Sequence, residues 1–256
     1  MAVAGGGAGH RRGRRREGGH LIAGHVTSGG TPPRPGAGTA PRCPQPPPLD
    51  RERLERYLDE LYEWNTRFNL TRIPRAEAWD RHVGEALELL AAAPPGEGAR
   101  VVDVGSGAGI PGIPIAVVRP DLEVVLCDSD QKRAGFLTHV ATLLGLERVH
   151  VAPVRAEDLG RTAGAREAFD AAVSRATAPP PVLCELCLPL LRTGGRLAAL
   201  VRDASAAAEA CAAAAAACGG GRPEAAAAGV LVVVKLTATP DAYPRRPGVP
   251  AKRPLV

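Results

Sequence analysis

The fold is decided by the stretch Val102-Asp103-Val104-Gly105-Ser106-Gly107-Ala108-Gly109-Ile110-Pro111-Gly112. A run of apolar, mostly β-branched residues ends at Val104 and predicts a buried strand over Arg100–Val104. Gly105, Gly107 and Gly109 predict a tight turn whose backbone can approach a ligand closely, followed by a helix to about Val118. Taken alone, the same glycines are also compatible with an ordinary turn between a strand and a helix.

Strands and helices are expected to alternate beyond this loop. The further strands predicted from apolar runs are Glu123–Cys127, Arg148–Ala152, Phe169–Ser174, Gly195–Val201 and Gly229–Leu236. The helices predicted between them are Gln131–Leu144, Pro181–Leu191 and Ala204–Ala217. Repeated β-α-β crossovers predict an α/β, Rossmann-like fold with a mostly parallel sheet and helices on both faces.

A helical extension is expected before the first strand. Apolar residues recur at helical spacing over residues 54–68, and Asp50 is suited to cap this helix. A second helix is predicted over residues 75–92. We interpret Trp64 and Phe68 as core residues rather than as platforms for stacked bases.

The chain is therefore divided into four parts. These are a tail over residues 1–48, a helical cap over 49–98, an α/β core over 99–242, and a basic segment over 243–256 that packs on or extends from the core. The tail is rich in Gly, Pro and Arg and is predicted to be disordered. It is compatible with an RNA-contacting extension, an organellar transit peptide or a mis-assigned translation start, and we favour a mis-assigned or dispensable tail.

The net charge of +5 is unevenly distributed. Residues 1–48 hold seven arginines and one glutamate, whereas the remaining residues hold 25 basic and 26 acidic side chains. The overall basicity is therefore no evidence that the folded body binds RNA. One local patch consists of Arg245, Arg246, Lys252 and Arg253, with no acid in the last 15 residues. This patch is compatible with RNA binding and also with a solvated tail.

Several classes of protein are disfavoured by the composition. No apolar run is long enough for a membrane-spanning helix, and the N-terminus lacks the apolar core of a signal peptide. The Cys184–Cys187 pair has C-x-x-C spacing, but it lies in a predicted helix without a second pair of metal ligands. We therefore predict no metal site and reduced cysteines in a cytoplasmic protein.

The spacing of the glycine loop points to a particular kind of cofactor. A dinucleotide-binding loop would carry glycine at position 110, where this chain has Ile110, and Pro111 removes an N–H that a pyrophosphate would use. Asp128 follows the second predicted strand and is suited to accept hydrogen bonds from ribose hydroxyls. It is also a candidate helix cap. Asp103 is suited to interact with the cationic end of an S-adenosylmethionine molecule, directly or through water.

At this point the residues resemble a known family, the small-subunit ribosomal RNA methyltransferase G family, formerly called glucose-inhibited division protein B. The resemblance runs from about Leu54 to Leu255. The motifs that carry it are Trp64-Asn65-x-x-Phe68-Asn69-Leu70-Thr71, Arg81-His82, residues 103–114 around the glycine loop, Asp128-Ser129 with Lys132-Arg133, Ala156-Glu157, Phe169-Asp170-x-x-x-Ser174-Arg175-Ala176, and the closing Tyr243-Pro244-Arg245-Arg246-Pro247-Gly248 with Pro250-x-Lys252-Arg253-Pro254. Two departures, Glu85-Ala86 and Val201-Arg202, stand where the family usually has Asp-Ser and a Lys, and Arg202 is a candidate substitute for that Lys.

The resemblance implies a class I S-adenosylmethionine-dependent methyltransferase with an N-terminal helical extension. It implies methyl transfer to N7 of a guanine in 16S rRNA, with the RNA or the small ribosomal subunit as partner. The cofactor residues expected from the loop and from the resemblance are Asp103, Gly105, Ser106, Gly107, Gly109, Ile110, Asp128, Ser129, Ala156, Glu157 and Arg175. We further expect a monomer that does not interact with membranes.

Arg175 is the predicted catalytic residue, because it ends a strand at the edge where ligands bind in this fold. It is suited to contact guanine O6, a phosphate or the cofactor, and the competing interpretation is an ion pair with Glu157 or Asp170. His82 is equally compatible with a buried hydrogen-bonded position and with RNA contact. A methyltransferase for a protein or small molecule, and a non-catalytic ribosome-binding module, remain alternatives.

Overall fold

The computed structural model describes residues 50–175, 177–226 and 229–255. The predicted tail over residues 1–48 lies outside them. Within the described residues, none of the helices is both long and apolar enough to span a bilayer.

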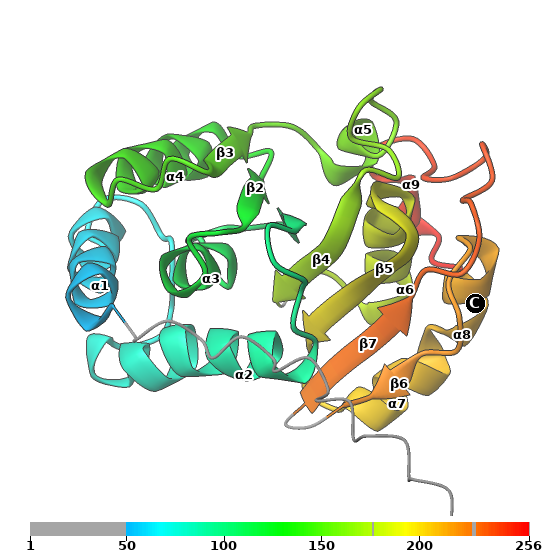
Figure 1. The fold of residues 1–256 in the computed structure, drawn as a ribbon, viewed down its shortest axis with the longest axis horizontal. Coiled ribbons are helices and arrows are strands. Elements are labelled where there is room, and N and C mark those ends of the chain that lie inside the picture. Colours follow the sequence, from blue (N-terminus) through cyan, green and yellow to red (C-terminus); the bar gives the residue numbers. More distant parts are fainter. Residues whose placement is uncertain (1–49, 176, 227–228, 256) are drawn as a thin grey trace, which may run out of the picture. The chain divides into compact units, whose positions relative to one another are not determined.

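The described residues form a mostly parallel sheet, as the sequence predicted (Figure 1). Its strands are β1 (Arg100–Val104), β2 (Glu123–Cys127), β3 (Val149–Ala152), β4 (Phe169–Arg175), β5 (Leu191–Leu200), β6 (Glu224–Ala225) and β7 (Val230–Val234). Their order is β3-β2-β1-β4-β5-β7-β6. Strands β1 to β5 pair in parallel, whereas β7 runs antiparallel to β5 and β6. The carboxyl ends of β1, β2 and β4 consequently meet at one edge.

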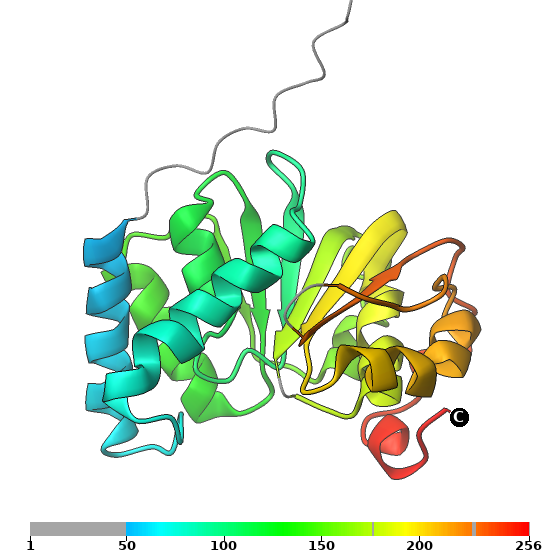
Figure 2. The ribbon, with the colours of Figure 1, turned by 90° about the horizontal axis from the view of Figure 1, so that it is seen from below.

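The pleat of the sheet separates two hydrophobic clusters. Val101 and Leu126 face the cluster that contains Tyr57, whereas Val102 and Val125 face the cluster that contains Leu183. Successive side chains of a strand point to opposite faces, so a continuous apolar run is what a sheet covered on both faces requires. The helices covering the first face are α1 (Arg51–Asn65), α2 (Glu85–Ala92), α3 (Gly112–Val118) and α4 (Gln131–Leu143), and those against the second include α6 (Pro180–Cys187) and α8 (Ala212–Ala217) (Figure 2).

The helical extension forms as expected at its start. Asp50 caps α1, because its side chain accepts a hydrogen bond from the backbone N–H of Arg53 at 3.0 Å. Trp64 packs against the hydrophobic cluster, with its ring 5.5 Å from the buried ring of Phe136, which agrees with a core position. The chain after α1 is tied back to it, since the side-chain oxygen of Asn65 accepts the N–H of Leu70 and of Thr71.

The second expected helix is not uniform. It consists of a 3-10 turn at Arg75–Glu77, a π-helical segment at Trp79–Gly84 and the α-helix α2. The π-helical segment carries Arg81 and His82 toward the sheet, and π-helical segments occur frequently at functional sites.

Other boundaries differ from the sequence predictions. Strand β5 begins at Leu191 rather than at Gly195, because the predicted helix over 181–191 ends as α6 followed by a 3-10 turn at Leu188–Leu190. The alanine-rich helix is divided at Cys211 into α7 (Ala204–Ala210) and α8. Two short helices, α5 (Ala156–Leu159) and α9 (Val249–Lys252), were not predicted, and neither is long enough to show helical periodicity.

Candidate active site

The glycine loop adopts the conformation that its sequence predicts. Gly105, Gly107 and Gly109 have φ angles of +73°, +57° and +91°, a region that side chains with a Cβ atom rarely occupy. A Cβ atom at Gly105 would lie 2.2 Å from the methyl carbon of Thr177, and one at Gly109 would lie 2.6 Å from Ile113. Glycine at 105 is therefore required both by the turn and by the close approach of the segment after β4.

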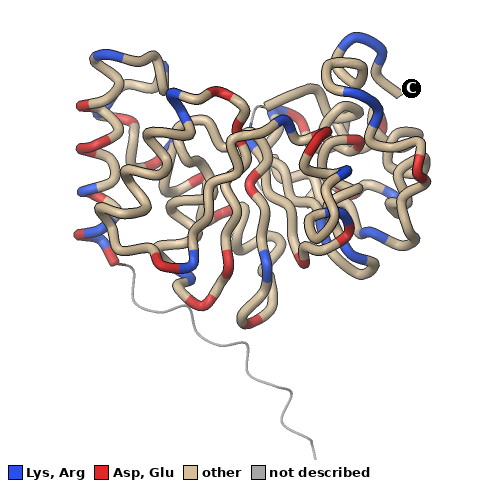
Figure 3. The backbone as a smooth tube through the Cα atoms, turned by 90° about the horizontal axis from the view of Figure 1, so that it is seen from above, with Lys and Arg blue, Asp and Glu red and all other residues tan. Residues whose placement is uncertain are grey.

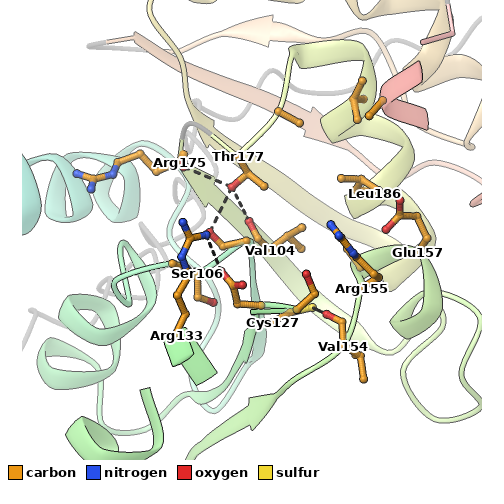
Figure 4. A pocket seen from close by; sticks show the side chains of 18 of the residues that line it. Val104, Ser106, Cys127, Arg133, Val154, Arg155, Glu157, Arg175, Thr177 and Leu186 are labelled. Carbon is orange, nitrogen blue, oxygen red and sulfur yellow. Dashed lines mark hydrogen bonds and ion pairs between the residues drawn. The ribbon is translucent and has the colours of Figure 1, made fainter. Parts of the chain in front are cut away.

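A cavity of about 490 Å³ lies at the carboxyl ends of β1, β2 and β4 (Figure 4). The predicted cofactor residues that line it are Gly105, Ser106, Gly107, Ile110, Asp128, Ser129, Ala156, Glu157 and Arg175. Asp103 and Gly109, which the structure also describes, are not part of its wall. The volume falls within the range of small-molecule sites.

Asp128 lies at the end of β2 and is 7% exposed. One carboxylate oxygen accepts the N–H of Gly107 at 2.9 Å, and the other accepts the N–H of Asp130 at 2.9 Å. The sequence also made Asp128 a candidate helix cap, but α4 is capped by Asp130, whose side chain accepts the N–H groups of Lys132 and Arg133. Because a carboxylate has about four acceptor positions, Asp128 keeps capacity for ligand hydroxyls while it holds the loop.

Asp103 lies beneath the glycine loop rather than in the cavity. It is fully buried, one oxygen accepts the N–H of Gly112 at 2.9 Å, and its Oδ1 atom has no hydrogen-bond partner among the described residues. Burial raises the pKa of Asp103 to about 7, against the lowering effect of the Gly112 hydrogen bond. Since a buried carboxylate oxygen without a partner is costly, this atom is suited to a cationic group or a water molecule brought by a ligand.

Glu157 connects the cavity to the C-terminal segment. It is 7% exposed, and its Oε1 atom accepts the N–H of Gly248 at 2.9 Å. Gly248 and Ala251 in turn line the cavity, so residues near the C-terminus form part of its wall. No local sequence signal indicates this closure, because it brings together positions 91 residues apart.

The predicted basic patch divides into one paired residue and three exposed ones. The guanidinium of Arg245 contacts both carboxylate oxygens of the buried Glu185, at distances down to 2.6 Å, and also donates to the Arg253 carbonyl. Arg246, Lys252 and Arg253 are exposed on the C-terminal segment, which carries several cations (Figure 3). Arg245 fixes this segment to α6, whereas the solvated side chains of the other three cations leave RNA binding a prediction.

Arg175 ends β4 between the cavity and the helical extension. Its Nη1 atom donates to the Arg81 carbonyl and lies 3.3 Å from Glu85, and its Nη2 atom donates to Nδ1 of His82 at 3.1 Å. The side chain extends away from Glu157 in Figure 4. Arg175 therefore pairs with Glu85, and not with Glu157 or Asp170 as the competing interpretation had it.

His82 is fully buried, which decides between the two interpretations of this residue. Burial, followed by the charge of Arg175, lowers the pKa of His82 to about 4, so the ring is neutral near pH 7. Arginine only donates hydrogen bonds, so Nδ1 of His82 accepts and Nε2 carries the proton. Nε2 lies 3.2 Å from the hydroxyl oxygen of Thr71 and donates to it. His82 consequently links Arg175 to the segment after α1.

Comparison with known proteins gives the family. Residues 50–224 match the model of the GidB family, described as rRNA small subunit methyltransferase G. The chain belongs to this family. It is 40% identical to the ribosomal RNA small subunit methyltransferase G of Moorella thermoacetica over 213 residues, which cover 79% of this chain and 89% of that relative. The Roseiflexus castenholzii protein of the same name is 39% identical, over 81% of this chain and 94% of that relative.

A solved structure supports the fold independently. The SAM-dependent O-methyltransferase of Thermotoga maritima has a TM-score of 0.50 and 17% identity, over 72% of this chain and 73% of that chain. This likeness concerns the arrangement of the sheet and helices. The methyltransferase fold expected from the sequence is confirmed.

The residues of this family member fit S-adenosylmethionine. Asp128, the predicted acceptor for ribose hydroxyls, is at the cavity wall, and the partnerless Oδ1 atom of Asp103 lies under the loop. The cavity also contains residues that sequence reasoning missed: Leu70, Val104, Ala108, Cys127, Arg133, Val154, Arg155, Thr177, Ala178, Val182, Leu186, Gly248 and Ala251. The hydroxyl of Thr177 donates to the Val104 carbonyl at 3.0 Å. The place of Thr177 in the site follows from its packing on Gly105, which the structure shows and the sequence does not.

Cys184 and Cys187 are both buried in α6, and neither forms a disulfide. Among the described residues, no group of three His, Cys, Asp or Glu side chains is arranged to hold a metal ion.

Proposed function

We propose that the chain transfers the methyl group of S-adenosylmethionine to N7 of a guanine in 16S rRNA. The observation that carries the proposal is the position of Arg175, which lines the cofactor cavity from the end of β4 while the glycine loop and Asp128 line it from β1 and β2. The cofactor supplies, when bound, an electrophilic methyl group on a sulfonium. The residues that would hold it are Asp128 and the backbone of Gly105 and Gly107.

The proposed reaction requires that guanine N7 and the methyl group are positioned in line, and it requires no general base. Guanine N7 has an exposed lone pair and no proton, so nothing has to be removed from the attacking atom. Holding two reactants in line contributes up to roughly 7–11 kcal/mol to rate enhancement. His82 is unsuited to act as a base here, because its Nδ1 lone pair accepts from Arg175 and its pKa is lowered to about 4. Arg175 is suited to hold guanine O6 or a phosphate while N7 stays available.

The exposed cations of the C-terminal segment provide the proposed RNA contacts. Arg246, Lys252 and Arg253 lie on the segment whose Gly248 and Ala251 line the cofactor cavity. Phosphates bound there would lie beside the methyl-transfer site. Arg245 belongs to the same patch, but its pairing with Glu185 gives it a structural task as well.

We further propose that the chain acts as a monomer in the cytoplasm, on 16S rRNA or the small ribosomal subunit. No metal ion and no membrane take part in this proposal.

The direct test is methyl transfer from labelled S-adenosylmethionine to small-subunit RNA that lacks N7-methylguanine. Label at one guanine, located by chemical cleavage at N7-methylguanine, is expected. Label on protein, on a small molecule or at another base atom would reject the proposal. In parallel, Arg175→Ala is expected to reduce transfer by about 100-fold with an unchanged circular dichroism spectrum, and near-normal turnover would remove Arg175 from the site.

A further inference from the structure

A second cavity of about 860 Å³ adjoins the first one. Arg175 and Ala178 line both cavities, so the two spaces meet at the end of β4. The second cavity is bounded by the π-helical segment and α2 on one side and by the end of β5 and α7 on the other. Its apolar walls include Ile73, Pro180 and Leu200. These walls are suited to a flat ring, and Arg175 is the one predicted cofactor residue among the described residues that line this cavity.

The polar wall of this second cavity contains an arginine and a glutamate side by side. Nη1 of Arg175 and Oε2 of Glu85 are 3.3 Å apart, and Oε1 of Glu85 accepts from Nε of Arg81 at 2.6 Å. The Glu85 side chain is 28% exposed, so its carboxylate remains accessible from the cavity. An arginine has five N–H donors. Three bonds of Arg175 have been described, two from Nη1 and one from Nη2. Its Nε–H and the second N–H of Nη2 have no partner among the described residues.

We propose that the second cavity receives the target guanine, and that Glu85 reads its N1–H and N2–H groups while Arg175 donates to O6. The inference rests on the proposed function. Guanine presents N7, O6, N1–H and N2–H in this order around its edge. A base whose N7 faces the cofactor cavity places O6 next to it and the two N–H donors beyond. Arg175 lines both cavities and Glu85 lines the second one but not the first, so the two side chains offer a donor and then an acceptor in the same order.

The neighbouring groups support this assignment. Arg175 is fixed by the Arg81 carbonyl and by His82, so it presents its remaining donors from a defined position. Adenine carries an amino group where guanine has O6 and lacks the N1 proton, so it would set a donor against Arg175 and a lone pair against Glu85. The departure Glu85-Ala86 from the family's usual Asp-Ser keeps the carboxylate and adds one methylene of reach.

The inference is tested with RNA that carries guanosine or inosine at the target position. Inosine keeps N7, O6 and N1–H but lacks the N2 amino group. The wild-type protein is expected to prefer guanosine by about tenfold in kcat/KM, because inosine cannot donate the second hydrogen bond to the charged acceptor. Glu85→Gln is expected to reduce this preference to about twofold, with unchanged S-adenosylmethionine affinity. Glu77→Gln is the matched control, since Glu77 also pairs with Arg81, at 3.9 Å, but lies outside the cavity lining.

The outcomes separate the two proposals. If the wild-type protein methylates no guanosine RNA at N7, the proposed function fails. If it does so and Glu85→Gln lowers kcat/KM equally on both substrates, Glu85 only supports Arg175 and the base-reading inference is overturned. An unchanged preference in Glu85→Gln, with normal rates on both RNAs, overturns it as well.

Discussion

Nδ1 of His82 accepts a hydrogen bond from the guanidinium of Arg175 at 3.1 Å, although the two residues are 93 positions apart in the chain. The contact joins the helical extension to the carboxyl end of β4. It joins the Arg81-His82 motif to the Ser174-Arg175 motif, because the first presents the acceptor that holds the side chain of the second. We therefore expect the buried His82 to position Arg175 rather than to act as a base or to contact RNA.

Substitution of His82 is expected to act through Arg175. His82→Leu removes the acceptor and should lower kcat by about 10- to 100-fold, the usual cost of removing a hydrogen bond to a charged group, with little change in S-adenosylmethionine affinity. His82→Asn retains an acceptor oxygen and should recover most of the rate. Steady-state kinetics with separate kcat and KM values check this, and full activity of His82→Leu would contradict it.

The same histidine predicts a pH dependence of stability. Its pKa is about 4 when folded against an ordinary value of 6.5, so the unfolded chain binds more protons between these values. The contribution of neutral His82 is complete above pH 6.5 and is lost as pH falls toward 4. The free energy of unfolding of His82→Asn should decline less over this window than that of the wild type. Parallel declines in urea titrations at pH 7, 5.5 and 4.5 would argue against it.

The pH dependence of stability that Asp103 causes should have the opposite sign. Its folded pKa is about 7 against an ordinary 3.8, so the folded chain holds the extra proton and stability falls as pH rises from 3.8 to 7. Asp103→Asn keeps an acceptor for the N–H of Gly112 and should stabilise the protein by about 1–2 kcal/mol above pH 7. It should also weaken S-adenosylmethionine binding by about tenfold, if the carboxylate meets the cationic end of the cofactor. Calorimetric titration at pH 8 separates the two effects, and unchanged affinity would remove Asp103 from the cofactor site.

The fold was predictable because its signals are local. Apolar runs such as Val101-Val102 and Val124-Val125 predict strands covered on both faces, and Gly105 with Gly107 predicts the turn between strand and helix. The location of Asp128 in the cavity wall followed from its place after the second strand, and its role as a ribose acceptor stays a prediction. These features depend on neighbours within about one turn or one strand, which a single sequence displays.

The parts that could not be predicted depend on distant partners. From the sequence alone Arg245 is expected to be an exposed cation, because its partner Glu185 is 60 positions away in the chain. The sequence does not show that the glycine loop covers the carboxylate of Asp103, so its place beneath the loop rather than in the cavity wall could not be predicted. The π-helical segment at Trp79–Gly84 keeps the apolar spacing of a helix, so periodicity alone does not distinguish it.

Glycine at 105 is expected to be indispensable. Gly105→Ala places a Cβ atom 2.2 Å from Thr177 at a φ angle of +73°, and we expect a loss of more than about 2 kcal/mol of stability together with loss of cofactor binding. Gly98→Ala is the control, because its φ angle is +65° but no atom lies within 4 Å of the added Cβ. It should cost only about 1 kcal/mol and leave binding intact. Equal behaviour of the two variants in thermal unfolding and cofactor titration would disprove the steric argument.

The pair of Arg245 and Glu185 should contribute strongly to stability. Arg245→Met leaves the carboxylate of Glu185, 1% exposed, buried without its cation, and such a break costs about 3–5 kcal/mol. Because the pair fixes the segment that carries Gly248, cofactor affinity should fall too. The double variant with Glu185→Leu should regain most of the stability. Arg53→Gln, which removes an exposed partner of Asp50, should change it by less than ~0.5 kcal/mol in urea titrations.

The three exposed cations of the C-terminal segment should govern the salt dependence of RNA binding. Each phosphate that the protein no longer neutralises is expected to reduce the slope of log affinity against log salt by about 0.7–0.9. Replacing Arg246, Lys252 and Arg253 together by Gln should therefore lower the slope by about 2. Cofactor affinity should stay unchanged, because these side chains are exposed and Arg245 bonds to the backbone carbonyl of Arg253, which the substitution keeps.

The control for this prediction removes exposed cations from the opposite edge of the sheet. Arg148 precedes β3, and Arg196 lies in β5 beside the Gly96–Gly98 turn that precedes β1. Both are exposed, and replacing them by Gln lowers the net charge by two without touching the C-terminal segment. If binding depends only on net charge, this variant will lose about two thirds as much slope as the triple variant. If phosphates are bound beside the cofactor cavity, it will keep the wild-type slope, because an exposed charge more than about 10 Å from the RNA is screened at 0.1 M salt.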